Sequence, residues 1–342
     1  MISFVKPSVN GYKADTFYGG LQLAELAGRN CYKTEGKASP GSYKDFLLNT
    51  IIKRGHTSIL EHCPCYFLFD TYKYENKEYD TEIINIIDSP YSRKVVGSSD
   101  VRCYTNLRIV YEKHERFALD MINCNPSHFD ELLKEYATEW FTPAIDDEFI
   151  RYTMNITTQR STVDELVRER ITSMAVESTR WCDYSEDGKH KMTFCIPHWV
   201  KNHIFDKCFQ DVIDIYNDYE KDDTNENSNL YRLLNITESL IHHYEDDDNE
   251  DRKRAYEYIA LAIRSTIEYN VLRDEYNLKP QDAREFLPLG IKSDIIYTAY
   301  YADWKVILLK RLYDALGKAH PNMHIIMQDI QLHLDGLRKK ES

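Results

Sequence analysis

The chain has 342 residues, which is enough to bury a substantial core in one large domain or two smaller ones. Its 56 acidic and 43 basic side chains give a formal net charge of -13. This balance argues against a broad basic surface for nucleic acid, so an anionic ligand would need a local basic pocket. No signal-peptide pattern and no apolar run of about 18 residues occurs. We therefore expect a soluble, cytoplasmic protein with no membrane or nucleic-acid partner.

The N-terminal half combines helical and strand patterns. Apolar residues at three- and four-residue spacing predict helices over residues 19–33, 43–56 and 128–141. A compact apolar run predicts a buried strand over 63–71, and alternation predicts a strand over 148–158. Between these elements the patterns are weaker, and we expect mixed structure there.

A further helix is predicted over residues 160–170. Thr162 is followed three residues later by Glu165, which is the spacing of a capping box. We therefore expect this helix to deliver Arg168 and Arg170.

The C-terminal half predicts long helices with a short one between them. Residues 204–220 and 252–276 are amphipathic, and the polar and acidic runs between them favour a loop over a domain boundary. Pro280 suits the first turn of a short helix, and Pro288 would end it. Residues 295–316 predict a strand or loop that runs into a helix. Helices dominate with strands interspersed, so the fold class is α/β or α+β.

The cysteines do not indicate a metal site or a disulfide framework. The eight cysteines include no Cys-x-x-Cys pair, and we expect reduced and mostly buried thiols. The stretch GHTSILEHCPC contains His56, Glu61, His62, Cys63 and Cys65. A structural zinc site usually needs two spaced ligand pairs, and no second pair follows. We therefore predict no metal.

The stretch RERITSMAVESTRW is rich in arginine and hydroxyl side chains. Arg168, Arg170 and Arg180 can offer paired donors to phosphate or carboxylate oxygens, and the hydroxyls can complete such a site. The alternative is an exposed helix face on which these arginines pair with Glu169 and Glu177. The choice depends on the rest of the chain.

Four segments occur in a fixed order: RGHTSILEH, RERITSMAVES, QDAREFLPLGIKSDI and ADWKVILLKR. Together they resemble the flavin-dependent thymidylate synthase (ThyX) family, whose signature is Arg-His-Arg, seven residues, then Ser. The resemblance extends from LAGRNCYK to AHPNM. It implies a ThyX-type fold, with a mixed sheet packed by long helices. It also implies one catalytic domain over residues 1–342, with insertions around 74–145 and 220–251.

The resemblance implies a homotetramer with active sites between subunits. Such enzymes methylate dUMP reductively to dTMP. Methylenetetrahydrofolate is the carbon donor, and FAD reduced by NADPH supplies the hydride. The expected partners are therefore dUMP and folate small molecules, with FAD as the cofactor.

The resemblance also assigns individual residues. The residues implied for catalysis are Ser178, Arg180 and Arg168. Those implied for dUMP are Arg168, Glu165, Ser178, Arg180, Arg284 and Arg311. Those implied for FAD are His56, Ser58, Glu61, Arg168, Glu169, Arg170 and His320. The serine is expected to position and polarise dUMP, and the arginines are expected to stabilise negative charge.

The chain departs from the family pattern on the flavin side. Glu169 replaces the signature histidine, and Tyr300 and Ala302 occupy positions where many relatives carry an asparagine and an arginine for FAD. An anion would disfavour reduced flavin unless Glu169 is protonated, paired with arginine or turned away. Two alternatives to an active synthase stay open. One is altered chemistry on a pyrimidine deoxynucleotide, such as hydroxymethylation, and the other is a non-catalytic nucleotide-binding relative.

Overall fold

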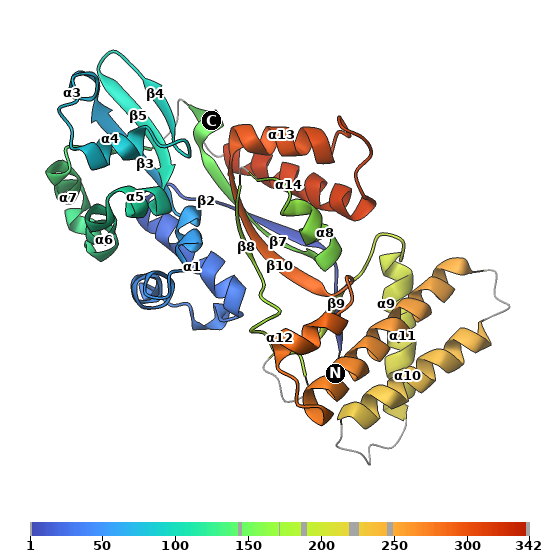
Figure 1. Ribbon diagram of the computed structural model, residues 1–342. Helices are drawn as coiled ribbons and strands as arrows, with labels where there is room; N and C mark the ends of the chain where they lie inside the picture. Colours follow the sequence, from blue (N-terminus) through green and yellow to red (C-terminus); the bar gives the residue numbers. More distant parts are fainter. Residues whose placement is uncertain are drawn as a thin grey trace.

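The computed structural model describes residues 2–142, 146–170, 172–185, 190–218, 226–244 and 249–339. Within these ranges the chain forms two four-stranded sheets, a two-stranded pair and many helices (Figure 1). The predicted fold class, α+β with long helices packed on sheets, is confirmed. The division into one domain with two insertions stays a prediction.

A central antiparallel sheet has the strand order β2–β7–β10–β8. Its strands are β2 (Ser8–Lys13), β7 (Arg151–Gln159), β10 (Lys292–Tyr300) and β8 (Ser173–Val176). β7 and β10 pair along their whole lengths, and most of their residues are buried. β8 pairs with the other edge of β10, where Ser173 lies opposite Thr298. The arginine-rich stretch therefore runs along an edge of this sheet.

Three helices cover the central sheet: α8 (Arg160–Leu166), α13 (Tyr301–Arg311) and α14 (Pro321–Lys339). Figure 1 shows α13 and α14 side by side against the sheet. Their shared core contains Trp304 and Met323 together with strand residues such as Tyr152 and Tyr297. The Trp304 Nε1 atom donates to the Tyr152 carbonyl at 3.1 Å, so the helix after β10 is fixed to β7 by a buried hydrogen bond.

A second antiparallel sheet has the order β4–β5–β3–β6. Its strands are β4 (Arg93–Val96), β5 (Asp100–Asn106), β3 (Pro64–Asp70) and β6 (Glu139–Trp140). The helices beside it are α1 (Phe17–Tyr32), α2 (Ser42–Phe46), α3 (Thr71–Glu75), α4 (Thr81–Ile87), α5 (Leu107–Lys113), α6 (Glu115–Asn123) and α7 (Phe129–Glu135). Aromatic residues fill the core between them, including Phe17, Phe67 and Phe117. The predicted insertion around 74–145 thus supplies three strands and four helices of a compact layer.

A third group of helices lies at the lower right of Figure 1. It contains α9 (Asn202–Asp218), α10 (Glu226–His243) and α11 (Glu250–Asn270), and its own apolar core includes Phe205, Leu233 and Ile263. A parallel pair, β1 (Ser3–Val5) and β9 (Thr193–Cys195), and the short α12 (Pro280–Ala283) lie between this group and the central sheet. Short 3₁₀ segments span Glu35–Lys37, Thr57–His62, Pro126–His128, Asp147–Phe149 and Arg284–Phe286, and π-helical turns span Leu47–Ile52 and Val271–Glu275.

The predicted capping box at the start of α8 is wrong. The helix begins directly after β7, so Gln159 occupies the N-cap position and Thr162 already lies in the first turn. The buried Gln159 amide donates to the Ile196 carbonyl at 3.0 Å, which fixes the end of the strand. The helix also ends earlier than predicted, so Arg168 and Arg170 follow it instead of lying on it.

The predicted helix over 128–141 is too long. The chain leaves α7 at Glu135, and Ala137 adopts a φ of 51°, a left-handed conformation that ends a helix. Trp140 then pairs with Phe67 in the second sheet, and the two rings meet edge to face at 6.1 Å. Burial of the tryptophan ring among aromatic neighbours accounts for the change from helix to strand.

The cysteines follow the sequence prediction. All eight cysteines are free thiols and six are buried, as predicted. Within the described ranges, no group of three or more His, Cys, Asp or Glu side chains is arranged to hold a metal ion. Among the helices of the same ranges, none combines the length and apolar character needed to cross a bilayer.

Candidate functional site

Strand β8 lies between the arginines that begin the signature and the serine that ends it. Arg168 and Arg170 are exposed before the strand, whereas Ser178 and Arg180 follow it. A strand rises about 3.3 Å per residue, so β8 alone spans roughly 13 Å. Within one chain, the residues predicted for catalysis therefore lie at two separate places, one at each end of β8.

A cavity of about 510 Å³ lies where the ends of the central strands meet the second sheet. Its lining comprises Glu61, Pro90, Tyr91, Arg93, Asn106, Arg108, Ile109, Glu112, Arg151, Arg170, Thr172, Ser173, Tyr300 and Asp303. Two residues predicted for FAD, Glu61 and Arg170, are therefore brought together although they lie far apart in the sequence. The volume is within the usual range for small-molecule sites, about 300–1,000 Å³.

Arg151 is the most deeply buried cation of this cavity, with 5% of its surface exposed. Its guanidinium donates to Ser173 Oγ at 2.8 Å and to the Glu61 carbonyl at 3.2 Å, and it lies 4.8 Å from the centre of the Tyr300 ring. Its Nε has no hydrogen-bond partner among the described residues. Arg151 thus keeps its charge in the wall of the cavity with only neutral hydrogen-bond partners.

Tyr300 forms a fixed part of the same wall. Its side chain is buried, and its hydroxyl donates to the Tyr104 carbonyl at 2.8 Å across to the second sheet. Burial, the largest influence, raises the pKa of Tyr300, so the phenol is neutral. Tyr300 therefore contributes a neutral aromatic side chain to the cavity wall.

Two arginines from the second sheet complete the lining. Arg108 lies between Glu61 and Glu112, so its charge is balanced by two carboxylates. Arg93 is closest to Asp303, at 3.7 Å between a guanidinium nitrogen and Oδ1. Burial raises the pKa of Asp303 against the opposing effects of Arg93 and Arg151. Sequence reasoning did not identify Arg93, Arg108 or Arg151. A charged residue at the start of the buried β7 was the available signal for Arg151.

The serine end of the signature meets the end of α1. The Ser178 amide donates to the Cys31 carbonyl at 3.1 Å. Trp181 and Tyr32 approach edge to face at 6.5 Å, and Tyr32 stacks at 6.1 Å on His56 and hydrogen-bonds its Nδ1. His56, predicted for FAD, therefore lies with the serine end and not at the arginine-lined cavity.

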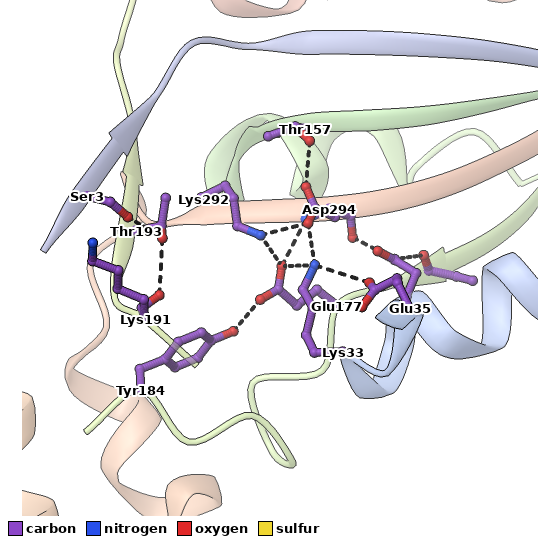
Figure 2. A network of polar contacts seen from close by, with 12 residues as sticks. Ser3, Lys33, Glu35, Thr157, Glu177, Tyr184, Lys191, Thr193, Lys292 and Asp294 are labelled. Carbon is purple, nitrogen blue, oxygen red and sulfur yellow. Dashed lines mark hydrogen bonds and ion pairs between the residues drawn. The ribbon is translucent and has the colours of Figure 1, made fainter. Parts of the chain in front are cut away.

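A network of charges surrounds Glu177, the residue that precedes Ser178 in the sequence (Figure 2). Glu177, 2% exposed, accepts from Tyr184 at 2.6 Å and from Lys292 at 3.0 Å, and it lies 3.2 Å from the Lys33 ammonium. Asp294 pairs with both lysines. The network joins α1, β8 and β10, and it holds the strand end that precedes Ser178. The alternative prediction, that Glu177 pairs with the signature arginines, is wrong because the lysines take that role.

Glu169 also points away from the cavity. It is buried, and its carboxylate lies 3.0 Å from the Lys310 ammonium and 3.3 Å from Arg311 Nε. Arg311 is 3.7 Å from Glu165, so these two residues predicted for dUMP do lie together. Glu169 is therefore paired with an arginine, which is one of the arrangements in which its negative charge would not disfavour reduced flavin. Glu169 does not line the cavity, and its predicted placement beside FAD stays a prediction.

The remaining predicted residues lie elsewhere. Arg284 is half-buried in the 3₁₀ turn after α12, and Ser58 is exposed in the turn before β3. His320 is exposed before α14, with its ring centre 5.2 Å from that of His198. None of these three lines the cavity.

His62, in contrast, is buried beside the cavity wall. Its Nδ1 is 2.8 Å from Thr298 Oγ1, and its Nε2 has no partner among the described residues. Burial, followed by the neighbouring Arg151, lowers the pKa of His62 to about 3. The imidazole is therefore neutral at physiological pH.

The arginines that line the cavity are of the kind that suits an anionic small molecule. A sequence model of the family described as Thymidylate synthase complementing protein matches residues 96–333. This range covers more than half of the chain and includes the whole Arg-x-Arg to Ser signature. The chain therefore belongs to this family, the ThyX type.

Two solved structures are also similar to the chain. One is thymidylate synthase X (ThyX) from Helicobacter pylori with FAD and dUMP, at 12% identity and a TM-score of 0.32, covering 98% of this chain and 96% of that one. The other is flavin-dependent thymidylate synthase ThyX from the same organism, complexed with FAD and dUMP. It shows 14% identity and a TM-score of 0.32, with 98% and 97% covered. No curated protein sequence matches. The family assignment rests on the sequence model.

Proposed function

We propose that the protein is a flavin-dependent thymidylate synthase that converts dUMP to dTMP. Methylenetetrahydrofolate is the carbon donor, and FAD reduced by NADPH is the hydride source. The observation that carries the proposal is the family match across the signature, combined with a cavity to which that signature contributes Arg170. The expected cytoplasmic location stays a prediction.

The residues of the cavity fit a flavin dinucleotide. The buried, incompletely paired guanidinium of Arg151 suits phosphate oxygens, and the buried ring of Tyr300 packs against this guanidinium and fixes its place in the wall. Arg170 and Glu61 agree with the residues that the resemblance implies for FAD. When bound, the flavin supplies the hydride, while these residues bind and orient it.

The proposed dUMP residues are those at the serine end of β8. Arg180 and Trp181 are exposed there, and Ser178 is held against α1 by its amide hydrogen bond. A guanidinium can bind the nucleotide phosphate, and a hydroxyl can polarise the pyrimidine carbonyl. Because β8 separates these groups from the cavity arginines, we propose that a second copy completes each site, as in the implied homotetramer.

The first experiment is the visible absorption spectrum of the purified protein, before and after addition of FAD and desalting. About one retained flavin per chain, together with dTMP as the product by mass spectrometry, is the expected outcome. The assay contains dUMP, methylenetetrahydrofolate and NADPH. A hydroxymethyl product would replace the synthase with altered chemistry, and dUMP binding without flavin would indicate a non-catalytic relative.

The assignment of Arg180 can be tested separately. Arg180→Ala should weaken dUMP binding by about tenfold or more, because a charge-assisted contact to phosphate is lost. Flavin retention should stay unchanged, since Arg180 and the cavity lie at opposite ends of β8. Equal losses of both ligands in titrations would show that the assignment of Arg180 is wrong.

A further inference from the structure

The arginine-lined cavity is built from two separate parts of the fold. Arg151 and Arg170 come from the central sheet and the segment before β8, whereas Arg93 and Arg108 come from the second sheet and α5. Arg93 opens β4, which is an edge strand, and about half of its side chain is exposed. The segment around 74–145, predicted only as an insertion, therefore contributes cations to the site.

The charges in this cavity are unevenly balanced. Arg108 is neutralised by Glu61 and Glu112. Among the described residues, the carboxylate nearest to Arg93 is that of Asp303 at 3.7 Å, and its guanidinium also lies over the Tyr300 ring, whereas Arg151 is held by a hydroxyl and a carbonyl. A buried guanidinium without a carboxylate partner favours binding of an anion.

The positions of the arginines favour an anion with several oxygens. Three arginines line the cavity from different parts of the chain: Arg93 from β4, Arg151 from β7 and Arg170 from the turn before β8. A diphosphate can accept from more than one such donor group at once, and each guanidinium can donate two parallel hydrogen bonds.

With the flavin site taken from the proposed function, we propose that Arg93 of the second sheet is one of the residues that bind the diphosphate of the flavin dinucleotide in this cavity. The inference rests on the proposed function for the identity of the dinucleotide. It gives the segment around 74–145, which contains Arg93, a direct role in the affinity for the cofactor. Arg93 and Arg151 approach the Tyr300 ring at 5.7 Å and 4.8 Å, so the tyrosine fixes the wall between the two guanidinium groups.

The test compares binding of FAD, riboflavin and ADP to wild-type protein and to Arg93→Ala, by fluorescence or absorbance titration. Loss of Arg93 should weaken FAD and ADP binding by about tenfold or more, and riboflavin binding by less than about twofold. Riboflavin lacks the phosphates but keeps the ring. Arg93→Lys should recover part of the loss, because it restores the charge without the planar fork.

Arg116→Ala is the matched control. Arg116 lies on α6 in the same segment, is largely exposed and pairs only loosely with Asp120 at 3.6 Å. This variant should bind FAD like the wild type. Thermal unfolding of each variant checks that the second sheet is intact, and a midpoint close to that of the wild type is expected for both alanine variants.

The outcomes separate the two proposals. If wild-type protein binds FAD and Arg93→Ala binds it equally well, the role of Arg93 is wrong while the synthase function stands. Weaker dUMP binding with unchanged FAD binding would show that the cavity holds a monophosphate. Binding of ADP but not FAD, dependent on Arg93, would support a diphosphate site and overturn the flavin function. Binding of neither ligand by the wild type would overturn both.

Discussion

Two groups of charged residues lie near the two ends of β8, and they differ in how completely their charges are paired. Around Glu177, two carboxylates and two lysines satisfy one another, with Tyr184 and Thr157 as additional donors (Figure 2). In the cavity, Arg151 has no carboxylate partner among the residues that the structure describes, and within the same residues its Nε is unpaired. Both groups contain buried cations, yet only the second offers hydrogen-bond donors to a ligand.

The comparison shows why burial of charge alone does not identify a site. A closed network stabilises the fold only while every member is present, because removal of one partner leaves a buried charge without compensation. An incompletely paired group next to a cavity gains from a ligand instead. Mutations in the two groups should therefore affect different measured quantities.

The largest expected effect is on stability, in the closed network. Glu177→Ala should lower the free energy of unfolding by about 3–5 kcal/mol, because Lys33 and Lys292 lose a buried carboxylate. Chemical denaturation measures this change. Glu35→Ala is the control, since this residue is more exposed and lies 3.6 Å from Lys33, and it should cost about 1 kcal/mol or less. If the two variants lose similar amounts of unfolding free energy, then Lys33 and Lys292 do not depend on the Glu177 carboxylate.

The next prediction concerns pH and the cavity wall. The folded-state pKa of His62, about 3, lies below the unfolded value of about 6.5. The unfolded chain therefore binds a proton first as the pH falls from about 6.5, and stability is lost down to the folded-state pKa. His62 alone should contribute a slope of up to about 1.4 kcal/mol per pH unit within this window.

The measurement is the free energy of unfolding between about pH 7 and pH 4.5, for wild type and His62→Gln. The glutamine keeps a polar contact for Thr298 but does not titrate, so its slope should be shallower. His128→Gln is the control, because His128 is exposed, and its slope should match that of the wild type. If the free energy of unfolding of His62→Gln changes with pH as steeply as that of the wild type, then the folded state does not oppose protonation of His62.

The local patterns of the sequence predict individual elements well where the core is apolar. α1, β3, β7 and α11 lie where periodicity and alternation place them, since their buried residues repeat at helical or strand spacing. α14 received no prediction, although its buried Met323, Ile326, Met327, Ile330 and Leu334 repeat at the same spacing. That signal was present in the sequence.

The candidate site could be predicted only in part. The resemblance assigned Glu61 and Arg170 to one site, and both residues line the same cavity, while their role with FAD stays a prediction. It could not supply Arg93, because this residue reaches the cavity through pairing of β4 with β5, which is a tertiary arrangement. The direction of Glu169 was also beyond local pattern, since it depends on the lysine and arginine at the end of α13.

The smallest expected effect concerns Glu169, which is intermediate between the two groups. Its carboxylate is buried, but Lys310 and Arg311 remain about one-quarter to one-third exposed, at 33% and 24%. Glu169→Gln should therefore lower the free energy of unfolding by only about 1 kcal/mol, because water can still solvate the released cations.

Flavin retention should stay the same, since the side chain points to α13 and does not line the cavity. Denaturation and FAD titration of the same preparation measure both quantities, with Glu148→Gln as a control for an exposed pair with Lys305. An increase of about tenfold in FAD affinity would show instead that Glu169 lies beside the cofactor and that its negative charge acts on the cavity.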